Sequence, residues 1–240
     1  MKAGIHRANY RYFADYGWLK TWHSFNFADY FNPLRERFGV IRVLNDEVIA
    51  PGKGFDMHEY KNLEILLFPL NGELKYQDQS GHESTLSQDE VQIISAGSGI
   101  TFAFGNNSNS LPLEIIQIWL FPKIKNINPR IQCLQFNERE RHGKFQLIAS
   151  PEVISDVLWI NQQTWISEID LLKGQSASYN IQKANNVIFI FVITGSILFG
   201  SNEDMEARQR DSVEITDIDG PWEFIANQDS KLLLVDAPRD

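Results

Sequence analysis

Imidazole side chains are the groups of this sequence best suited to bind a metal ion or to move a proton near neutral pH. Two of them have a simple explanation, because His82 lies in a polar turn-like stretch and His23 lies among aromatic residues. His58 differs, since Tyr60 follows it two positions later in the stretch GFDMHEY. Residues i and i+2 of a β-strand project to one face, so a base and a hydrogen-bond donor would lie together here. No imidazole occurs beyond residue 142, because the histidines are His6, His23, His58, His82 and His142.

Cys133 is the only cysteine of the chain. A single thiol excludes an internal disulfide and any metal site built from several cysteines, and it fits a reducing cytoplasm. Its flanks (IQCLQF) are largely apolar, so we expect a small buried side chain. The alternative is a redox sensor, which needs an exposed thiol with a lowered pKa.

The overall composition is that of an ordinary folded protein, with 240 residues of which 43% are hydrophobic and 22% are charged. A net charge of −9 argues against a nucleic-acid surface. The longest apolar run, at 187–193, is far shorter than a membrane-spanning helix, and the first residues lack the apolar core of a signal peptide. We therefore expect a soluble cytoplasmic protein with no nucleic-acid or membrane partner.

Short runs of β-branched and aromatic residues, separated by Gly, Pro, Asn, Asp and Ser, dominate the sequence. This pattern predicts an all-β protein. One short helix is expected at 150–157, with Ser150 as its N-cap and a proline in its first turn. The expected strands cover residues 40–44, 64–67, 73–77, 91–94, 115–121, 165–171, 187–193, 196–200, 212–215 and 232–235.

The two halves of the chain repeat the same landmarks at an offset of 122 or 123 residues. The stretch ILLFPLNG at 65–72 resembles IFIFVITG at 188–195, and DEV at 89–91 resembles DSV at 211–213. A duplicated β unit is the economical explanation, and units of about 100 residues suit small jelly-roll barrels. We expect an N-terminal domain at 1–136, a charged linker at 137–144 and a C-terminal domain at 145–240.

Longer motifs extend over nearly the whole chain. They include ADYGWLKTWHSFNFADYFNP from residue 14, APGKGF at 50–55, SAGSGI at 95–100 and FQLIASP at 145–151. Together they resemble the pirins, a family of bicupin proteins that includes bacterial flavonol-cleaving quercetinases. The resemblance implies two tandem cupin domains, each a jelly-roll β-barrel, packed face to face, with a metal in the first barrel.

In that family, His-x-His after the GxGF segment and His-x-Glu shortly after SAGxGI hold the metal. Three imidazoles and a carboxylate suit an iron-like divalent ion with a position left for substrate. The corresponding positions here hold His58, Tyr60, Phe102 and Phe104. Phenyl rings cannot ligate a metal, so we expect the site to be lost and filled with apolar core. The alternative is an atypical site made by His58, Tyr60 and Glu64, which would take Fe, Mn, Ni or Cu.

These observations favour a metal-free pirin-like bicupin that binds a small aromatic molecule or a protein partner, with a regulatory or stress-related role. A second hypothesis is an oxygenase like the quercetinases, in which His58 acts as a lone base beside Tyr60. A third is redox sensing through Cys133. Because two barrels already cover each other, we expect a monomer.

Overall fold

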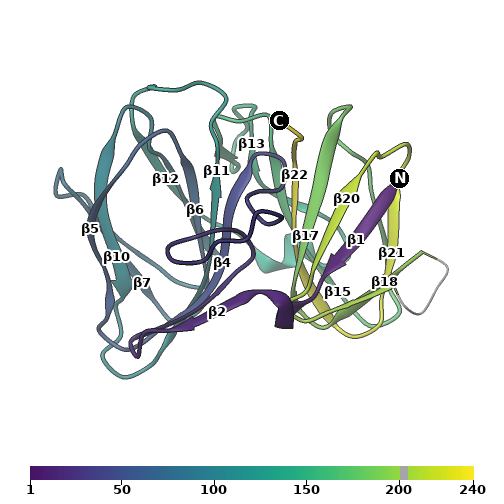
Figure 1. Cartoon of the computed structure of the whole chain (residues 1–240), viewed down its shortest axis with the longest axis horizontal. Coiled ribbons are helices and arrows are strands. Elements are labelled where there is room, and N and C mark those ends of the chain that lie inside the picture. The colour runs from purple at the N-terminus through teal and green to yellow at the C-terminus, as the bar shows by residue number, and fades with distance from the viewer. Residues whose placement is uncertain (201–204) are drawn as a thin grey trace.

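The computed structural model describes residues 1–200 and 205–240 and consists of two β-barrels side by side (Figure 1). Each barrel is formed by a seven-stranded and a four-stranded antiparallel sheet, apart from one parallel pair in the second barrel. In the first barrel the seven-stranded sheet has the order β12 (Arg130–Gln135), β9 (Glu90–Ser95), β6 (Glu64–Asn71), β11 (Leu113–Leu120), β4 (Ile41–Ile49), β3 (Leu19–His23) and β2 (Tyr12–Asp15). The four-stranded sheet has the order β5 (Gly54–Tyr60), β10 (Ile100–Asn106), β7 (Leu74–Asp78) and β8 (Glu83–Leu86).

The second barrel has the same plan. Its seven-stranded sheet has the order β1 (Lys2–His6), β20 (Ser212–Thr216), β17 (Asn186–Thr194), β22 (Ser230–Pro238), β15 (Trp165–Leu171), β13 (Gln146–Ser150) and β14 (Leu158–Trp159). Its four-stranded sheet has the order β16 (Ser176–Tyr179), β21 (Trp222–Ala226), β18 (Ser196–Phe199) and β19 (Glu206–Arg208). The prediction of an all-β protein made of two cupin barrels is therefore confirmed.

Helical structure is confined to two 3₁₀ turns in the described residues, η1 (Ala8–Tyr10) and η2 (Glu138–Arg141). The predicted helix at 150–157 is wrong. Ser150 is instead the last residue of β13, and its hydroxyl donates to the Glu152 carbonyl at 2.9 Å. No helix in the described part of the chain is long and apolar enough to cross a membrane.

The sequence repeat corresponds to equivalent strands. The repeated octapeptides form most of β6 and β17, which hold the third position in their sheets. β1 takes the edge position in the second sheet that β12 takes in the first, and it pairs with β20. The predicted N-terminal domain of residues 1–136 thus contains five residues that belong to the second barrel's sheet.

The two seven-stranded sheets face each other. Since strand residues alternate between two faces, β4 sends Ile49 into the first barrel and Leu44 toward the second. Leu44 belongs to one apolar cluster that also contains Ile116 of β11 and Phe189 and Phe191 of β17. The predicted face-to-face packing therefore rests on a continuous buried layer shared by both barrels.

The connection between the barrels is fixed by one buried arginine in η2. Arg141 donates to Asp89 of the first barrel at 2.7 Å and to Asp170 of the second at 2.8 Å. Its third carboxylate neighbour, Glu168, lies 3.7 Å away and is also 3.6 Å from Lys231. These ion pairs tie the predicted linker 137–144 to both barrels.

Candidate functional site

The four positions singled out by the sequence lie on two neighbouring strands of the first barrel. β5 carries His58 and Tyr60, and β10 carries Phe102 and Phe104. Phe102 is directly opposite His58, whereas Phe104 is opposite Phe55, because β5 contains a bulge between these two pairs. The structure thus brings all four positions to one part of the sheet, as the spacing predicted.

The two phenylalanines lie inside the barrel. Phe102 and Phe104 are 1% and 4% exposed and belong to the apolar cluster that fills the first barrel. The Tyr60 ring stacks on Phe102 with a centroid distance of 4.3 Å, and the Phe55 ring lies 4.7 Å from Phe104. Burying two phenylalanine side chains is worth about 3–6 kcal/mol. The rings therefore act as structural core at these positions.

His58 and Tyr60 do not form a metal-binding pair. His58 is exposed, and its Nδ1 lies 3.1 Å from the carbonyl oxygen of Asp56 on the same strand. Tyr60 is half-buried; burial, and then the charge of Glu47, raise the pKa of its hydroxyl to about 12. The phenol is therefore protonated at neutral pH, so it can donate a hydrogen bond and does not act as a base.

Glu64 does not complete the alternative site with His58 and Tyr60. It lies on the face of β6 that points to the second barrel, where its Oε2 accepts from the Ser95 hydroxyl at 2.7 Å and the Asn161 backbone N–H at 3.2 Å. Its neighbour Ile65 instead points into the first barrel. Within residues 1–200 and 205–240, no group of three or more His, Cys, Asp or Glu side chains could hold a metal ion. The donor set at the family position therefore does not fit the divalent metal that the resemblance implies.

A buried carboxyl group near Tyr60 was missed by the sequence-based prediction. Glu47 of β4 is completely buried and accepts hydrogen bonds from Gln117 Nε2 at 2.5 Å and from the Thr21 hydroxyl at 3.2 Å. Gln117 in turn accepts from Trp119 Nε1 at 3.0 Å, and the Trp119 ring lies edge-on to Tyr60. Burial raises the pKa of Glu47 to about 7. The signal in the sequence was a pair of acidic residues inside the apolar run of β4.

His23 is a core residue next to this network. Its side chain is 1% exposed and packs against the rings of Tyr12 and Phe27. Burial, and then the charge of Arg11, lower its pKa to about 4. The imidazole is therefore neutral at physiological pH, in keeping with the expected role in packing.

Cys133 does not match the expectation of a buried side chain. It lies on β12, an edge strand, and is exposed. Partial desolvation of the thiol, and then the nearby charge of Glu90, raise its pKa to about 11. The exposure that a redox sensor needs is present, but the lowered pKa that would make the thiol reactive is not.

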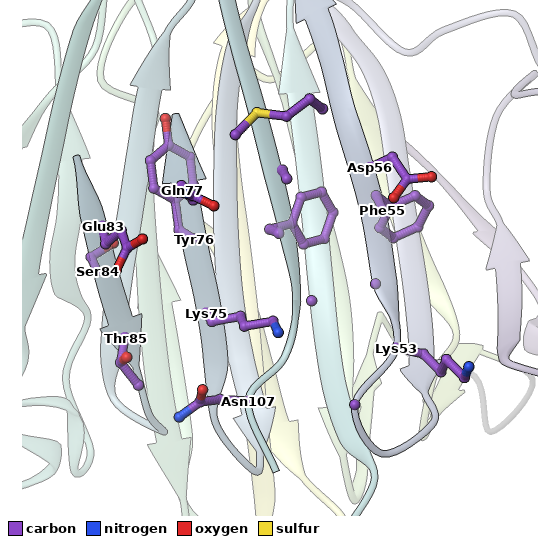
Figure 2. A pocket seen from close by; sticks show the side chains of 16 residues that line it. Lys53, Phe55, Asp56, Lys75, Tyr76, Gln77, Glu83, Ser84, Thr85 and Asn107 are labelled. Carbon is purple, nitrogen blue, oxygen red and sulfur yellow. The ribbon is translucent and has the colours of Figure 1, made fainter. Parts of the chain in front are cut away.

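A groove lies over the four-stranded sheet that carries the aromatic positions. It has a volume of about 670 Å³, and residues of β5, β7, β8 and β10 line it. Figure 2 shows Lys75 and Lys53 in its lower part and Gln77 and Asp56 in its upper part. Gly54 of β5 and Gly105 of β10 also line the groove, and their backbones are in close contact. A Cβ on Gly54 would lie 2.5 Å from the Gly105 Cα, so the close contact requires glycine.

Comparison with known proteins identifies the family. Residues 6–120 match the family model Pirin, and residues 147–237 match the Quercetinase C-terminal cupin domain. The quercetin 2,3-dioxygenase of Escherichia coli K12 is 34% identical over 234 residues, which cover 98% of each chain. The chain belongs to the pirin family. Pirin-like protein YhaK of the same organism is 39% identical over 168 residues, or 70% of each chain.

Solved structures of pirins have the same fold. The crystal structure of the bacterial pirin YhhW of Escherichia coli in complex with nickel(II) has a TM-score of 0.92 and 33% identity, covering 99% of each chain. The structure of YhaK has a TM-score of 0.73 and 33% identity, covering 93% of this chain and 96% of YhaK. The backbone arrangement of this pirin-family protein is therefore close to that of the solved pirin YhhW.

Proposed function

We propose that this pirin-family bicupin works without a metal in its first barrel, as a protein that binds a small organic molecule or a protein partner in a regulatory or stress-related role. The observation that carries the proposal is the stack of Tyr60 on Phe102, with Phe104 beside it. Aromatic carbon occupies the space that ligand side chains would need. His58 alone supplies one exposed imidazole, which is too few donors to hold a divalent ion in a defined geometry.

Metal content is the first measurement that tests this proposal. Untagged protein purified without chelator should contain less than about 0.1 equivalent of Fe, Mn, Ni or Cu by inductively coupled plasma mass spectrometry. The matched control restores the family pattern by combining Tyr60→His, Phe102→His and Phe104→Glu. This variant should be less stable than the wild type without metal and should bind close to one equivalent. Near-stoichiometric metal in the wild type would contradict the proposal.

The groove over β5, β7, β8 and β10 is the proposed site for a small ligand. Lys53 and Lys75 can pair with an acidic group of a flat aromatic molecule whose ring contacts Phe55 and Met57. Asp56 and Glu83 also line the groove and balance the charge of the two lysines. Replacing both Lys53 and Lys75 by glutamine should weaken binding of the fluorescent naphthalene sulfonate dye ANS about fivefold in a titration.

Lys173→Gln is the control for the groove, because this exposed lysine lies in the second barrel. It should leave the affinity for the dye unchanged. Equal affinity of the double lysine variant and the wild type would place the ligand elsewhere.

The second candidate is oxygenase activity. It is favoured by the relative named quercetin 2,3-dioxygenase and by the nickel complex of YhhW. His58 would then act as a general base and Tyr60 as a hydrogen-bond donor to the substrate. Flavonol absorbance followed for hours with excess protein and added Fe, Mn, Ni or Cu decides the question. Loss of absorbance that disappears in His58→Ala supports an oxygenase, and unchanged absorbance rejects it. Redox sensing by Cys133, a monomeric state and a cytoplasmic location stay predictions.

A further inference from the structure

A layer of buried polar groups lies between the two barrels, beneath the N-terminal segment. On the face of the second barrel that points to the first, His6 of β1, Ser212 of β20 and Phe191 of β17 are cross-strand neighbours in one row. Gly4, Glu214 and Phe189 form the next row along the same strands. Figure 1 shows β1 joining this sheet before the chain passes to the first barrel through β2.

Two arginines cover these rows. The Arg11 guanidinium lies 5.2 Å from the centroid of the Phe191 ring, above the first row. Arg35 stands above the second row, because its Nη1 lies 2.8 Å from Glu214 Oε1. Both side chains are removed from solvent, with 2% of Arg11 and 14% of Arg35 exposed. Two cationic groups are therefore buried over neighbouring rows of one sheet face.

Several donors of these groups have no partner. Arg11 donates only through Nη2, to Asp46 at 3.2 Å, which leaves its Nε and Nη1 unpaired and buried among the described residues. Arg35 Nη2 is buried and unpaired in the same way, as are atoms of neighbouring groups. These neighbours are His6 Nδ1, Ser24 Oγ and Ser212 Oγ. Buried donors without partners are rare in folded proteins and indicate an ion or ordered water.

Unpaired donors outnumber unpaired acceptors among these groups. The nearby carboxylates pair with arginines: Asp46 with Arg11 and Arg210, Glu114 with Arg210, Glu214 with Arg35, and Asp211 with Arg7. One carboxylate oxygen, Glu214 Oε1, is buried without a hydrogen bond, against the unpaired donor atoms of Arg11, Arg35 and Arg210. Burial, and then the positive charges of Arg35 and Arg11, lower the pKa of His6 to about 4 against the opposing effect of Asp211. The imidazole is thus neutral at pH 7 and stands in a positive potential.

We propose that a small monovalent anion of the chloride class binds between Arg11 and Arg35, where the Ser212 hydroxyl also donates to it. The phenylalanine rings beside the arginines leave few polar groups for a larger oxyanion. A dianion would bring more charge than two partly neutralised guanidinium groups can balance. By joining Arg11, Arg35 and the second barrel's sheet, the anion holds the N-terminal segment against both barrels.

Thermal unfolding at constant ionic strength tests the site in the full chain, with sodium chloride replacing sodium gluconate. Chloride should raise Tm in a saturable manner, by about 5 °C at about 100 times the dissociation constant. The shift should be lost in Arg11→Gln and kept in the matched control Arg37→Gln, because Arg37 is exposed and its partners are Asp240 and the Gly39 carbonyl. Ser212→Ala removes one donor without removing charge, and it should weaken the chloride effect in a folded protein.

Bromide in crystals of the wild type supplies the second measurement. An anomalous peak within hydrogen-bond distance of Arg11 and Arg35 supports the proposal. A peak elsewhere, a Tm that does not respond to chloride, or equal responses of Arg11→Gln and Arg37→Gln would overturn it and assign the unpaired donors to ordered water.

Discussion

Replacing Arg141 by methionine should lower the free energy of unfolding by about 3–5 kcal/mol, because it leaves buried carboxylates without their cation. Arg141 is 2% exposed and bridges Asp89 of the first barrel to Glu168 and Asp170 of the second. The remaining cation, Lys231, lies 3.6 Å from Glu168 and 3.9 Å from Asp89 and cannot serve all three acids. Urea unfolding followed by tryptophan fluorescence measures the loss.

Two further variants identify the cause of this loss. Adding Glu168→Gln to Arg141→Met should restore part of the stability, since burial already raises the pKa of Glu168 and Lys231 would be the one cation left beside it. Lys144→Met, which breaks an exposed ion pair with Glu140 four residues away, should leave the unfolding midpoint where it is. A midpoint for Arg141→Met equal to that of the wild type would show that the ion cluster does not hold the barrels together.

Glu47→Gln should make the protein more stable above pH 7, by about 3 kcal/mol. The pKa of Glu47 is about 7 in the folded state against an ordinary value of 4.5, because of burial. The unfolded chain releases this proton above pH 4.5 while the folded protein keeps it. The stability that the proton contributes is therefore complete below pH 4.5, decreases between pH 4.5 and 7, and is absent above pH 7. The two proteins should accordingly differ little at pH 4.5 and most at pH 8.

The control for this pH profile is Glu59→Gln, an exposed glutamate on β5. It should follow the wild-type profile at every pH. Some pH dependence should remain in Glu47→Gln, because burial also raises the pKa of Glu64 to about 7. A stability difference between Glu47→Gln and the wild type that is the same at pH 4.5 and pH 8 would mean that Glu47 is already ionised in the folded protein.

The clearest strand signals in the sequence come from strands with apolar residues on both faces. β6, β11, β17 and β22 lie between a barrel interior and the inter-barrel layer, so their sequences are continuous apolar runs. β7, which alternates between buried and exposed residues, was also predicted. β8 has only one buried residue, and its polar sequence gives no strand signal. A proline inside a strand pattern favours a bulge or a sheet edge. Pro69 lies at an irregularity in the β6–β11 pairing, beyond the residues of β6 that pair with β9.

The sequence predicted where the candidate site lies, but not which other side chains surround it. The family spacing led to His58 and Phe102, which are cross-strand neighbours. It could not reveal that Glu64 points to the second barrel, because the face of a strand depends on which layer each side contacts. Glu47 was missed for the same reason, since its partners Thr21 and Gln117 come from strands far apart in the sequence. The residues that flank Cys133 are largely apolar, but its strand lies at the edge of the sheet. Local composition does not show whether a strand is at an edge.

The place of β1 has a consequence for synthesis of the chain. β1 is translated first, but its partner β20 follows about 210 residues later, which at about 5–20 residues per second takes about 10–40 s. β22, which separates β17 from β15, follows β20 along the chain. The second barrel can therefore close only after β22 has been synthesised. Until β20 has been made, β1 has no partner strand, whereas the strands of the first barrel all end by residue 135 and can already pair.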